Sequence, residues 1–279
     1  MASAHHPGAS VGKAAPQPGA PRRLVSLFIP REHGSWGMLL TVLILAPAAL
    51  GTGGAAWWFA GGSAVLFFAR RPWEIWLRTA PEPDETARRA ALLLTILGLA
   101  LGGVGLWVTA SALTAVLAVL AAALAGVSAY SESHPERRGA AAGRLAGVAA
   151  MVALLLLQVA AAFGHITPAG WGLAGLCLAY FLTSALRVRS LVRARKVQGF
   201  RLVSLILHAC ILLGAAAAAW AGWVPRLAPL AYGPGLVQAA AILRRDATPV
   251  NTLRMGIGEI LHATAFVALT ILAYRLPAA

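Results

Sequence analysis

The chain has 279 residues, of which 59% are hydrophobic and only 11% are charged, and its mean hydropathy is +0.75. Soluble domains carry about a quarter charged residues, so this composition excludes that class and predicts a polytopic membrane protein. The net charge of +14 does not indicate nucleic-acid binding, because the basic residues are divided among short segments between apolar runs. We therefore expect the lipid bilayer as the partner, and no nucleic acid.

Residues 1–28 are rich in Ala, Gly and Pro and contain no long apolar stretch. This composition predicts a disordered cytoplasmic tail, because such a segment cannot bury enough apolar surface to fold. It is not typical of a secretory signal, which needs a continuous apolar region and a cleavage site. We expect residues 29–279 to form a single transmembrane helical domain.

Nine apolar runs follow the tail, and each is long enough, or nearly long enough, to cross a bilayer. A transmembrane helix needs about 20 residues, with a tolerated range of about 17–25. The runs span residues 36–51, 55–70, 90–109, 111–130, 145–163, 170–186, 202–222, 226–243 and 255–274. The third and fourth are separated only at Ala110, but about forty residues are too many for one crossing. The expected fold is therefore all-α, with about nine transmembrane helices in a compact bundle.

The positions of the basic residues predict the orientation of the bundle. Of the 23 lysines and arginines, all but Arg226 and Arg275 lie before the first run or in the connections from even to odd runs. The positive-inside rule then places the N-terminus in the cytoplasm and the C-terminus outside. The longer connections share the cytoplasmic side, so we expect a functional site near that face.

The stretch from Ile29 to Gly37 concentrates ionisable and aromatic residues where the first apolar run begins. Arg31, Glu32 and His33 are consecutive, and Trp36 follows. Charged groups near hydrocarbon are costly and need partners, which makes these residues candidates for a site. The alternative is an interfacial anchor, in which Trp36 sits at the headgroup level and the charged residues begin a helix.

Glu259, His262 and His208 are ionisable residues inside the predicted spans. Glu259 and His262 lie one turn apart and share a helix face. Glu-x-x-His is a metal-ligand spacing in helical bundles, but a full site needs a second such pair, which this sequence lacks. The alternative is a hydrogen-bonded Glu–His or Glu–Arg pair that joins two helices. With His33, two of the three histidines could bind haem axially or relay protons.

The connection after the second run carries Arg71 and a group of acidic residues, Glu82, Asp84 and Glu85. Carboxylates beside arginines could hold Mg²⁺ against a diphosphate. The plainer interpretation is a turn followed by a helix start, where acidic residues are favourable. Both alternatives stay open on the sequence alone.

The segment Pro30-Arg31-Glu32-His33-Gly34-Ser35-Trp36 closely resembles the N-terminal motif of the YwiC-like family, and the multi-span layout of the chain is similar too. This resemblance implies a multi-pass protein of the bacterial cytoplasmic (inner) membrane, and it implies no particular reaction.

A more distant resemblance is to the UbiA-type aromatic prenyltransferases. It is carried by the nine spans, the inside N-terminus and Tyr130-Ser131 followed by Arg137-Arg138. The two Asp-rich motifs of that superfamily are absent. Arg187 and its basic neighbours occupy the place of the second motif, so the seats for Mg²⁺ are missing. If the chain is an enzyme, this resemblance implies a prenyltransferase-like transferase.

Three hypotheses follow from these observations. The first is a UbiA-like bundle with a cytoplasm-facing pocket for a lipid or isoprenoid substrate. Its lining would comprise Arg31, Glu32, His33, Trp36, Arg71, His208, Glu259 and His262. The second is a transporter that uses Glu259, His208 and His262 as a path through the membrane. The third is an accessory or assembly protein of respiratory complexes that holds haem through two histidines.

Overall fold

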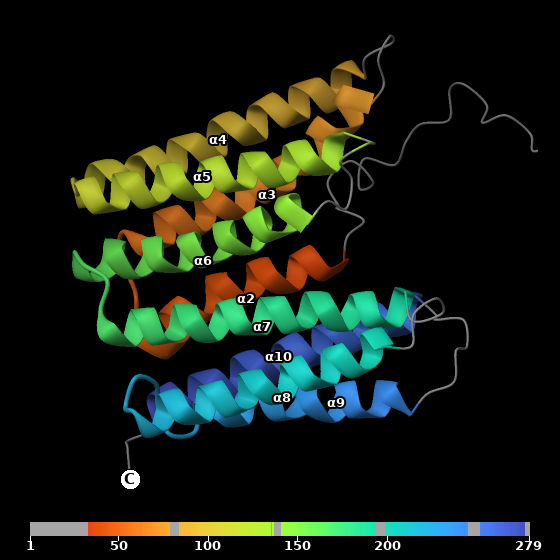
Figure 1. Cartoon of the computed structure of the whole chain (residues 1–279). Helices are drawn as coiled ribbons and strands as arrows, with labels where there is room; N and C mark the ends of the chain where they lie inside the picture. Colours follow the sequence, from red (N-terminus) through yellow and green to blue (C-terminus); the bar gives the residue numbers. More distant parts are fainter. Residues whose placement is uncertain are drawn as a thin grey trace, which may run out of the picture.

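The computed structural model describes residues 33–78, 84–134, 136, 141–193, 199–244 and 252–276, and within these ranges the chain is all-α (Figure 1). The helices are α2 (His33–Leu50), α3 (Ala56–Arg78), α4 (Glu85–Thr109), α5 (Ala112–Ser133), α6 (Ala141–Phe163), α7 (Pro168–Arg193), α8 (Gly199–Trp220), α9 (Gly233–Leu243) and α10 (Thr252–Arg275). A short 3₁₀ helix, η1 (Ala228–Tyr232), precedes α9. Each predicted apolar run coincides with a helix, or with η1 and α9 together.

The structure confirms the all-α class and a multi-pass arrangement. Six helices are long and apolar enough to cross a membrane, namely α4, α5, α6, α7, α8 and α10. Two apolar segments are shorter, Gly37–Leu50 of α2 and Ala228–Leu243. The count of nine crossings and the direction of insertion stay predictions.

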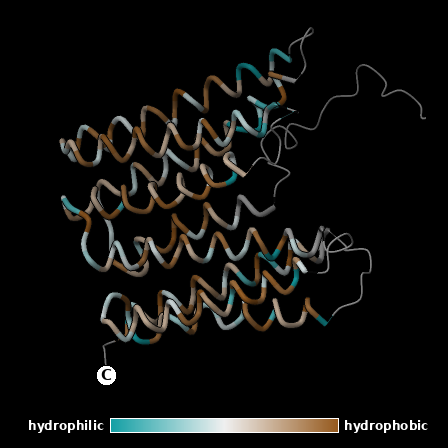
Figure 2. Tube along the Cα trace, viewed as in Figure 1, coloured by the Kyte–Doolittle hydropathy of each residue, from teal (hydrophilic) through white to brown (hydrophobic). Residues whose placement is uncertain are grey.

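The helices lie side by side and alternate in direction along the chain (Figure 1). Helix α2 therefore begins at one end of the bundle, where the helix boundaries at Arg78 and Glu85 also lie, and α10 ends at the other. Polar residues gather near helix ends and apolar residues cover the middle (Figure 2). We call the end where α2 begins the basic end, because in the described residues most arginines lie towards it and only Arg226 and Arg275 lie at the opposite end.

Exposed apolar side chains cover the outside of the bundle, as a membrane protein requires. Helices α4 and α5 are largely exposed, although they are among the most apolar. Exposed tryptophans mark the end opposite the basic one: Trp57, Trp58, Trp107, Trp171, Trp220 and Trp223. Such a belt is typical of a membrane interface, where the ring is partly wet and partly apolar.

Small residues bring two helix pairs into close contact. A Cβ atom added to Gly62 on α3 would lie 2.8 Å from the backbone oxygen of Gly98 on α4. On α6, a Cβ at Gly143 would lie 2.4 Å from the Cβ of Ser131 on α5, and one at Gly147 would lie 2.9 Å from the hydroxyl of Ser128. These contacts explain how α3 packs on α4 and α5 on α6 with little apolar bulk between them.

Ala110 separates α4 from α5, as the sequence predicts, and it does so in the left-handed conformation with φ of 45°. Its backbone N–H closes α4 by donating to the Leu106 oxygen at 2.9 Å. A non-glycine residue in this conformation is strained by about 1–2 kcal/mol.

We expect Ala110→Gly to raise the free energy of unfolding by about 1 kcal/mol, because glycine adopts positive φ without steric cost. Denaturation by SDS, followed by circular dichroism, measures this change. Ala112→Gly, inside the first turn of α5, is the control. It should lower stability by a similar amount, since glycine weakens a helix by about 1 kcal/mol relative to alanine. A loss of stability in Ala110→Gly would contradict the assigned conformation.

Candidate functional site

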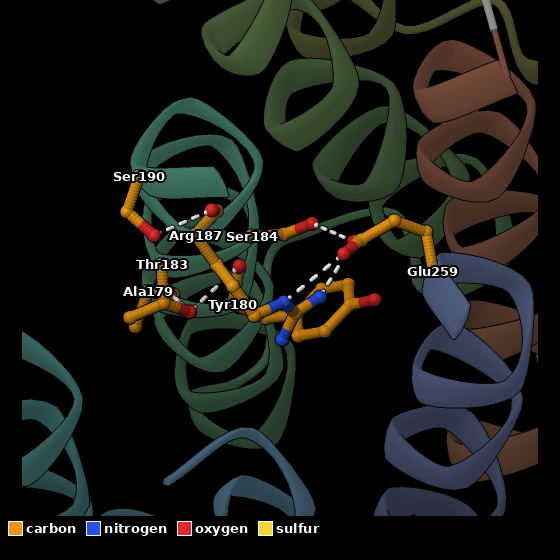
Figure 3. A network of polar contacts seen from close by, with 7 residues as sticks. All are labelled: Ala179, Tyr180, Thr183, Ser184, Arg187, Ser190 and Glu259. Atoms are coloured by element: carbon orange, nitrogen blue, oxygen red, sulfur yellow. Dashed lines mark hydrogen bonds and ion pairs between the residues drawn. The ribbon is translucent and has the colours of Figure 1, made fainter. Parts of the chain in front are cut away.

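A buried ion pair joins α7 to α10 near the basic end. Arg187 donates from Nε to Oε1 of Glu259 at 3.0 Å and from Nη2 to Oε2 at 2.5 Å (Figure 3). The hydroxyl of Ser184 donates to the same Oε2 at 2.9 Å. The Arg187 side chain is 0% exposed and that of Glu259 is 11% exposed. The two planar groups thus form a fork-to-fork contact, the strongest geometry available to an Arg–carboxylate pair.

Helix α7 carries the residues on its side of the ion pair on a single face. Tyr180, Ser184 and Arg187 are spaced four and three residues apart, so they lie on one face of the helix. The Tyr180 ring stacks on Phe266 of α10 with ring centroids 4.0 Å apart, and on His262 with centroids 5.5 Å apart. These stacked rings fix the α7–α10 interface on which the ion pair depends.

One part of the Arg187 guanidinium is left without a partner. Glu259 takes the Nε and Nη2 edge, while Nη1 is buried and has no hydrogen-bond acceptor among the described residues. A buried, unpaired donor on a charged group costs about 1–3 kcal/mol or more. Nη1 of Arg187 could therefore donate one further hydrogen bond to an acceptor that the described residues do not supply.

A small pocket lies beside the pair, between α2, α7 and α10. Its polar lining is Ser184, Glu259 and the Tyr180 ring, and its apolar lining comprises Met38, Ile260 and Ala263, with Gly37. It has room for about one water molecule. Helix α2 lies against α10 here, since a Cβ at Gly37 would make ordinary contact with the Cβ of Ala263 at 3.7 Å. Ile260 is exposed on the outside of the bundle, so the pocket reaches the lipid-facing surface.

Two buried histidines, His208 of α8 and His262 of α10, lie against Gly235 of α9. A Cβ added to Gly235 of α9 would lie 3.1 Å from Nε2 of His262 and 3.3 Å from Cδ2 of His208. Nδ1 of His208 is 2.7 Å from the backbone oxygen of Ser204, and its buried Nε2 has no partner among the described residues. Both rings therefore pack closely on Gly235, where an added side chain would have no room.

A comparison with known protein families finds a match in the N-terminal half of the chain. The family model described as YwiC-like protein matches residues 29–159. Residues 29–159 are YwiC-like. The match begins at the motif that predicted this family and extends through α2 to most of α6. Neither a curated protein nor a solved structure matches the chain, so the UbiA-type resemblance stays a prediction.

The YwiC-like segment contributes one wall of the pocket. Gly37 and Met38 on α2 come directly after the opening motif, whereas Ser184, Arg187 and Glu259 lie outside the matched residues. Of the predicted site residues in that motif, Arg31 and Glu32 lie outside the described residues. His33 and Trp36 lie on α2, but their side chains are outside what the structure describes.

The remaining predicted site residues fall into two groups. Glu259 of α10 pairs with Arg187 of α7, whereas His262 of α10 and His208 of α8 both lie against Gly235 of α9. Arg71 instead donates to Glu74 on its own helix α3 at 3.0 Å. It belongs to a separate polar cluster of the YwiC-like segment, in which Trp73 donates to the hydroxyl of Thr95 on α4 at 2.9 Å.

The structure shows contacts that bear on two pairs of alternatives left open by the sequence. Glu259 forms the Glu–Arg pair that joins two helices, and its partner is Arg187. Asp84 caps α4 by accepting from the N–H of Ala87 at 3.0 Å, and Glu85 pairs with Arg88, as a helix start requires. Glu82 lies outside the described residues. In the part of the chain that the structure describes, no three His, Cys, Asp or Glu side chains group together as a metal site would need.

Arg187, Ser184 and Tyr180 were not singled out from the sequence as site residues. Arg187 begins a run of basic residues after the sixth apolar segment, and such runs usually serve topology or anionic lipid. The available signal was indirect: a lone carboxylate inside a span needs a cation, and Tyr180, Ser184 and Arg187 share one helical face.

Proposed function

We propose that this membrane protein binds an amphiphile with an anionic head group, of the lipid or isoprenoid phosphate type, between α2, α7 and α10. The observation that carries the proposal is the guanidinium of Arg187, which is wholly buried yet has one nitrogen without an acceptor among the residues that the structure describes. A phosphate or carboxylate oxygen supplies that acceptor, and arginine forks match the geometry of both groups.

The lining of the pocket supports an amphiphile rather than a free anion. Ser184 offers a hydroxyl on one side, while Met38, Ile260 and Ala263 offer apolar contacts towards the lipid. Arg187 is not among the residues that line the pocket, so a head group that enters over Ser184 would reach Nη1 only after lining side chains shift, while its tail would follow the exposed Ile260 into the bilayer. A head larger than water needs neighbouring side chains to move, and the flexible Met38 suits that requirement.

Charge balance assigns a role to each member of the pair. Without ligand, Glu259 neutralises Arg187 in a region where an isolated charge is costly. An anionic head that contacts Nη1 would share the single positive charge of Arg187 with Glu259, so its binding requires one proton on the head or on Glu259. In this proposal Arg187 is the binding residue and Glu259 holds it in position.

Native mass spectrometry of the purified protein tests the proposal. We expect an anionic amphiphile to remain bound to the wild type and to be lost from Arg187→Met/Glu259→Met, which removes the charges as a pair. Separate additions of an isoprenyl phosphate and an anionic diacyl phospholipid distinguish the two sources of the head group. Loss of one charge-assisted hydrogen-bonding group should weaken binding about ten- to hundredfold.

The exposed pair Glu85–Arg88 provides the matched control, because Arg88→Met/Glu85→Met removes the same chemistry from the surface of α4. Equal retention of the amphiphile in wild type and in both double variants would contradict the proposal.

Binding is the step that the geometry supports, and it is compatible with a transferase or a transporter. Flux of the bound amphiphile into vesicles would indicate a transporter, and its covalent conversion would indicate a transferase. In both cases Arg187→Met/Glu259→Met should abolish the effect, because the head group would no longer be held.

A further inference from the structure

A second group of charged side chains lies on α3 towards the basic end, within the YwiC-like segment and apart from the Arg187–Glu259 pair. Glu74 follows Arg70 by four residues and Arg71 by three, so the three side chains share one face of the helix. Oε1 of Glu74 lies 3.3 Å from Nε of Arg70, and its Oε2 accepts from Nη1 of Arg71 at 3.0 Å. One carboxylate therefore serves two guanidinium groups, and Arg71 receives only one of its oxygens.

The side chain of Arg71 is 12% exposed and that of Glu74 is 14% exposed, so this contact is largely removed from water. A charge in such a place is costly unless a counter-charge and hydrogen-bond acceptors lie beside it. Glu74 supplies part of what Arg71 requires, because its other oxygen faces Arg70.

The free part of Arg71 is the edge of the guanidinium that forms Nε and Nη2. Arg187 uses this same edge to bind both oxygens of Glu259. In Arg71, Glu74 meets Nη1 instead, and Nε is buried without a partner among the described residues. Nη2 has no hydrogen bond among those residues either and, unlike Nε, it is not fully buried. Arg71 thus keeps a two-donor edge that is reached from the surface at Nη2.

Neighbouring contacts hold this turn of α3 in place. The indole of Trp73 donates to the hydroxyl of Thr95 on α4 at 2.9 Å, and that hydroxyl donates to the Ala91 oxygen at 2.7 Å. The rings of Trp73 and Trp76 meet edge to face with centroids 5.2 Å apart. Because the backbone on both sides of Arg71 is fixed, little order has to be gained when the arginine binds a ligand.

We infer that the Nε–Nη2 edge of Arg71 binds a phosphate group at the basic end of the YwiC-like segment. The planar fork of a guanidinium matches two oxygens of a phosphate. Phosphate groups are abundant at a bilayer surface, and basic clusters there attract anionic lipids. The phosphate approaches from the surface at Nη2 and needs no enclosed cavity. Because Nε is buried, the second hydrogen bond forms when the long arginine side chain turns outward.

The head group of an anionic phospholipid and free inorganic phosphate share this chemistry, so the test has two arms. Both use the full chain carrying Arg187→Met/Glu259→Met, in which the first anion site cannot contribute. Native mass spectrometry measures retention of phosphatidic acid against phosphatidylcholine, and equilibrium dialysis measures binding of radiolabelled inorganic phosphate. Retention of phosphatidic acid alone identifies a lipid head group, whereas binding of inorganic phosphate identifies a soluble ligand. If that double variant does not fold, the same substitutions in the wild-type chain should remove one of two binding events.

Substitutions of the pair should shift the affinity in opposite directions. Arg71→Lys keeps the charge but loses the fork, and it should weaken binding about tenfold. Arg71→Met should weaken it further. Glu74→Gln should tighten binding about two- to fivefold, because the guanidinium would no longer be shared with a carboxylate. A purely structural role of the pair would not produce tighter binding.

The exposed pair Glu85–Arg88 on α4 has the same spacing of three residues and supplies the controls. Arg88→Met and Glu85→Gln should leave the affinity unchanged. The inference is overturned if neither ligand binds, if phosphatidylcholine is retained as well as phosphatidic acid, or if Arg71→Met binds as tightly as Arg88→Met. Weaker binding in Glu74→Gln would overturn it too. None of these outcomes bears on the site at Arg187, which is absent from the protein used.

Discussion

Glu259→Gln should lower the free energy of unfolding by about 3–5 kcal/mol, because it leaves the buried guanidinium of Arg187 without its counter-charge. The glutamine keeps the size of the side chain and can still accept from Ser184, so the loss reports on charge. Denaturation with SDS, followed by circular dichroism, measures the change.

Two further variants separate the charge from the packing. Glu85→Gln removes one member of the exposed Glu85–Arg88 pair and should cost no more than about 1 kcal/mol, since exposed ion pairs contribute little. Arg187→Met/Glu259→Met should recover most of the stability lost in Glu259→Gln, because well-packed apolar residues replace buried ion pairs at little cost. If the double variant were as unstable as the single one, the uncompensated charge would not be the cause.

Gly62→Ala should lower the free energy of unfolding by about 1–3 kcal/mol through overpacking. The new Cβ would lie 2.8 Å from the backbone oxygen of Gly98 and 3.2 Å from the backbone nitrogen of Gly102. Backbone atoms of a neighbouring helix cannot move aside as a flexible side chain can, so α3 and α4 must separate.

The adjacent Gly61 provides the control for this substitution. A Cβ at Gly61 would lie 3.9 Å from a methyl carbon of Leu101, which is ordinary contact, so Gly61→Ala should cost nothing and gain helix propensity. Equal effects of the two substitutions on stability would show that the close approach of α3 to α4 is absent.

Much of the fold could be predicted from the order of apolar runs, because each run had to satisfy its own backbone hydrogen bonds within the bilayer. The break at Ala110 was predicted correctly, and Asp84 caps α4, as the plainer of the two interpretations of that segment expects. The extension of α3 to Arg78 is explained by local pairing, since Glu74 forms ion pairs with Arg70 and Arg71. These features depend on neighbours within one or two helical turns.

The candidate site could be predicted only in part, because its contacts are distant in sequence. Arg187 and Glu259 are 72 residues apart in the sequence. To predict that they pair, one must know how α7 and α10 are oriented about their own axes in the bundle. The sequence showed that Glu259 needed a partner, but several arginines were equally eligible. His208 and His262 both pack on Gly235 of α9, a residue that carries no polar signal of its own.

Photoaffinity labelling with a diazirine-bearing isoprenyl phosphate, followed by peptide mass spectrometry, tests the central claim most directly. We expect labels to concentrate on the pocket residues Met38, Ile260 and Ala263, and to disappear from them in Arg187→Met/Glu259→Met. Labels spread evenly over the exposed apolar faces of α4 and α5, and unchanged by that double substitution, would contradict it.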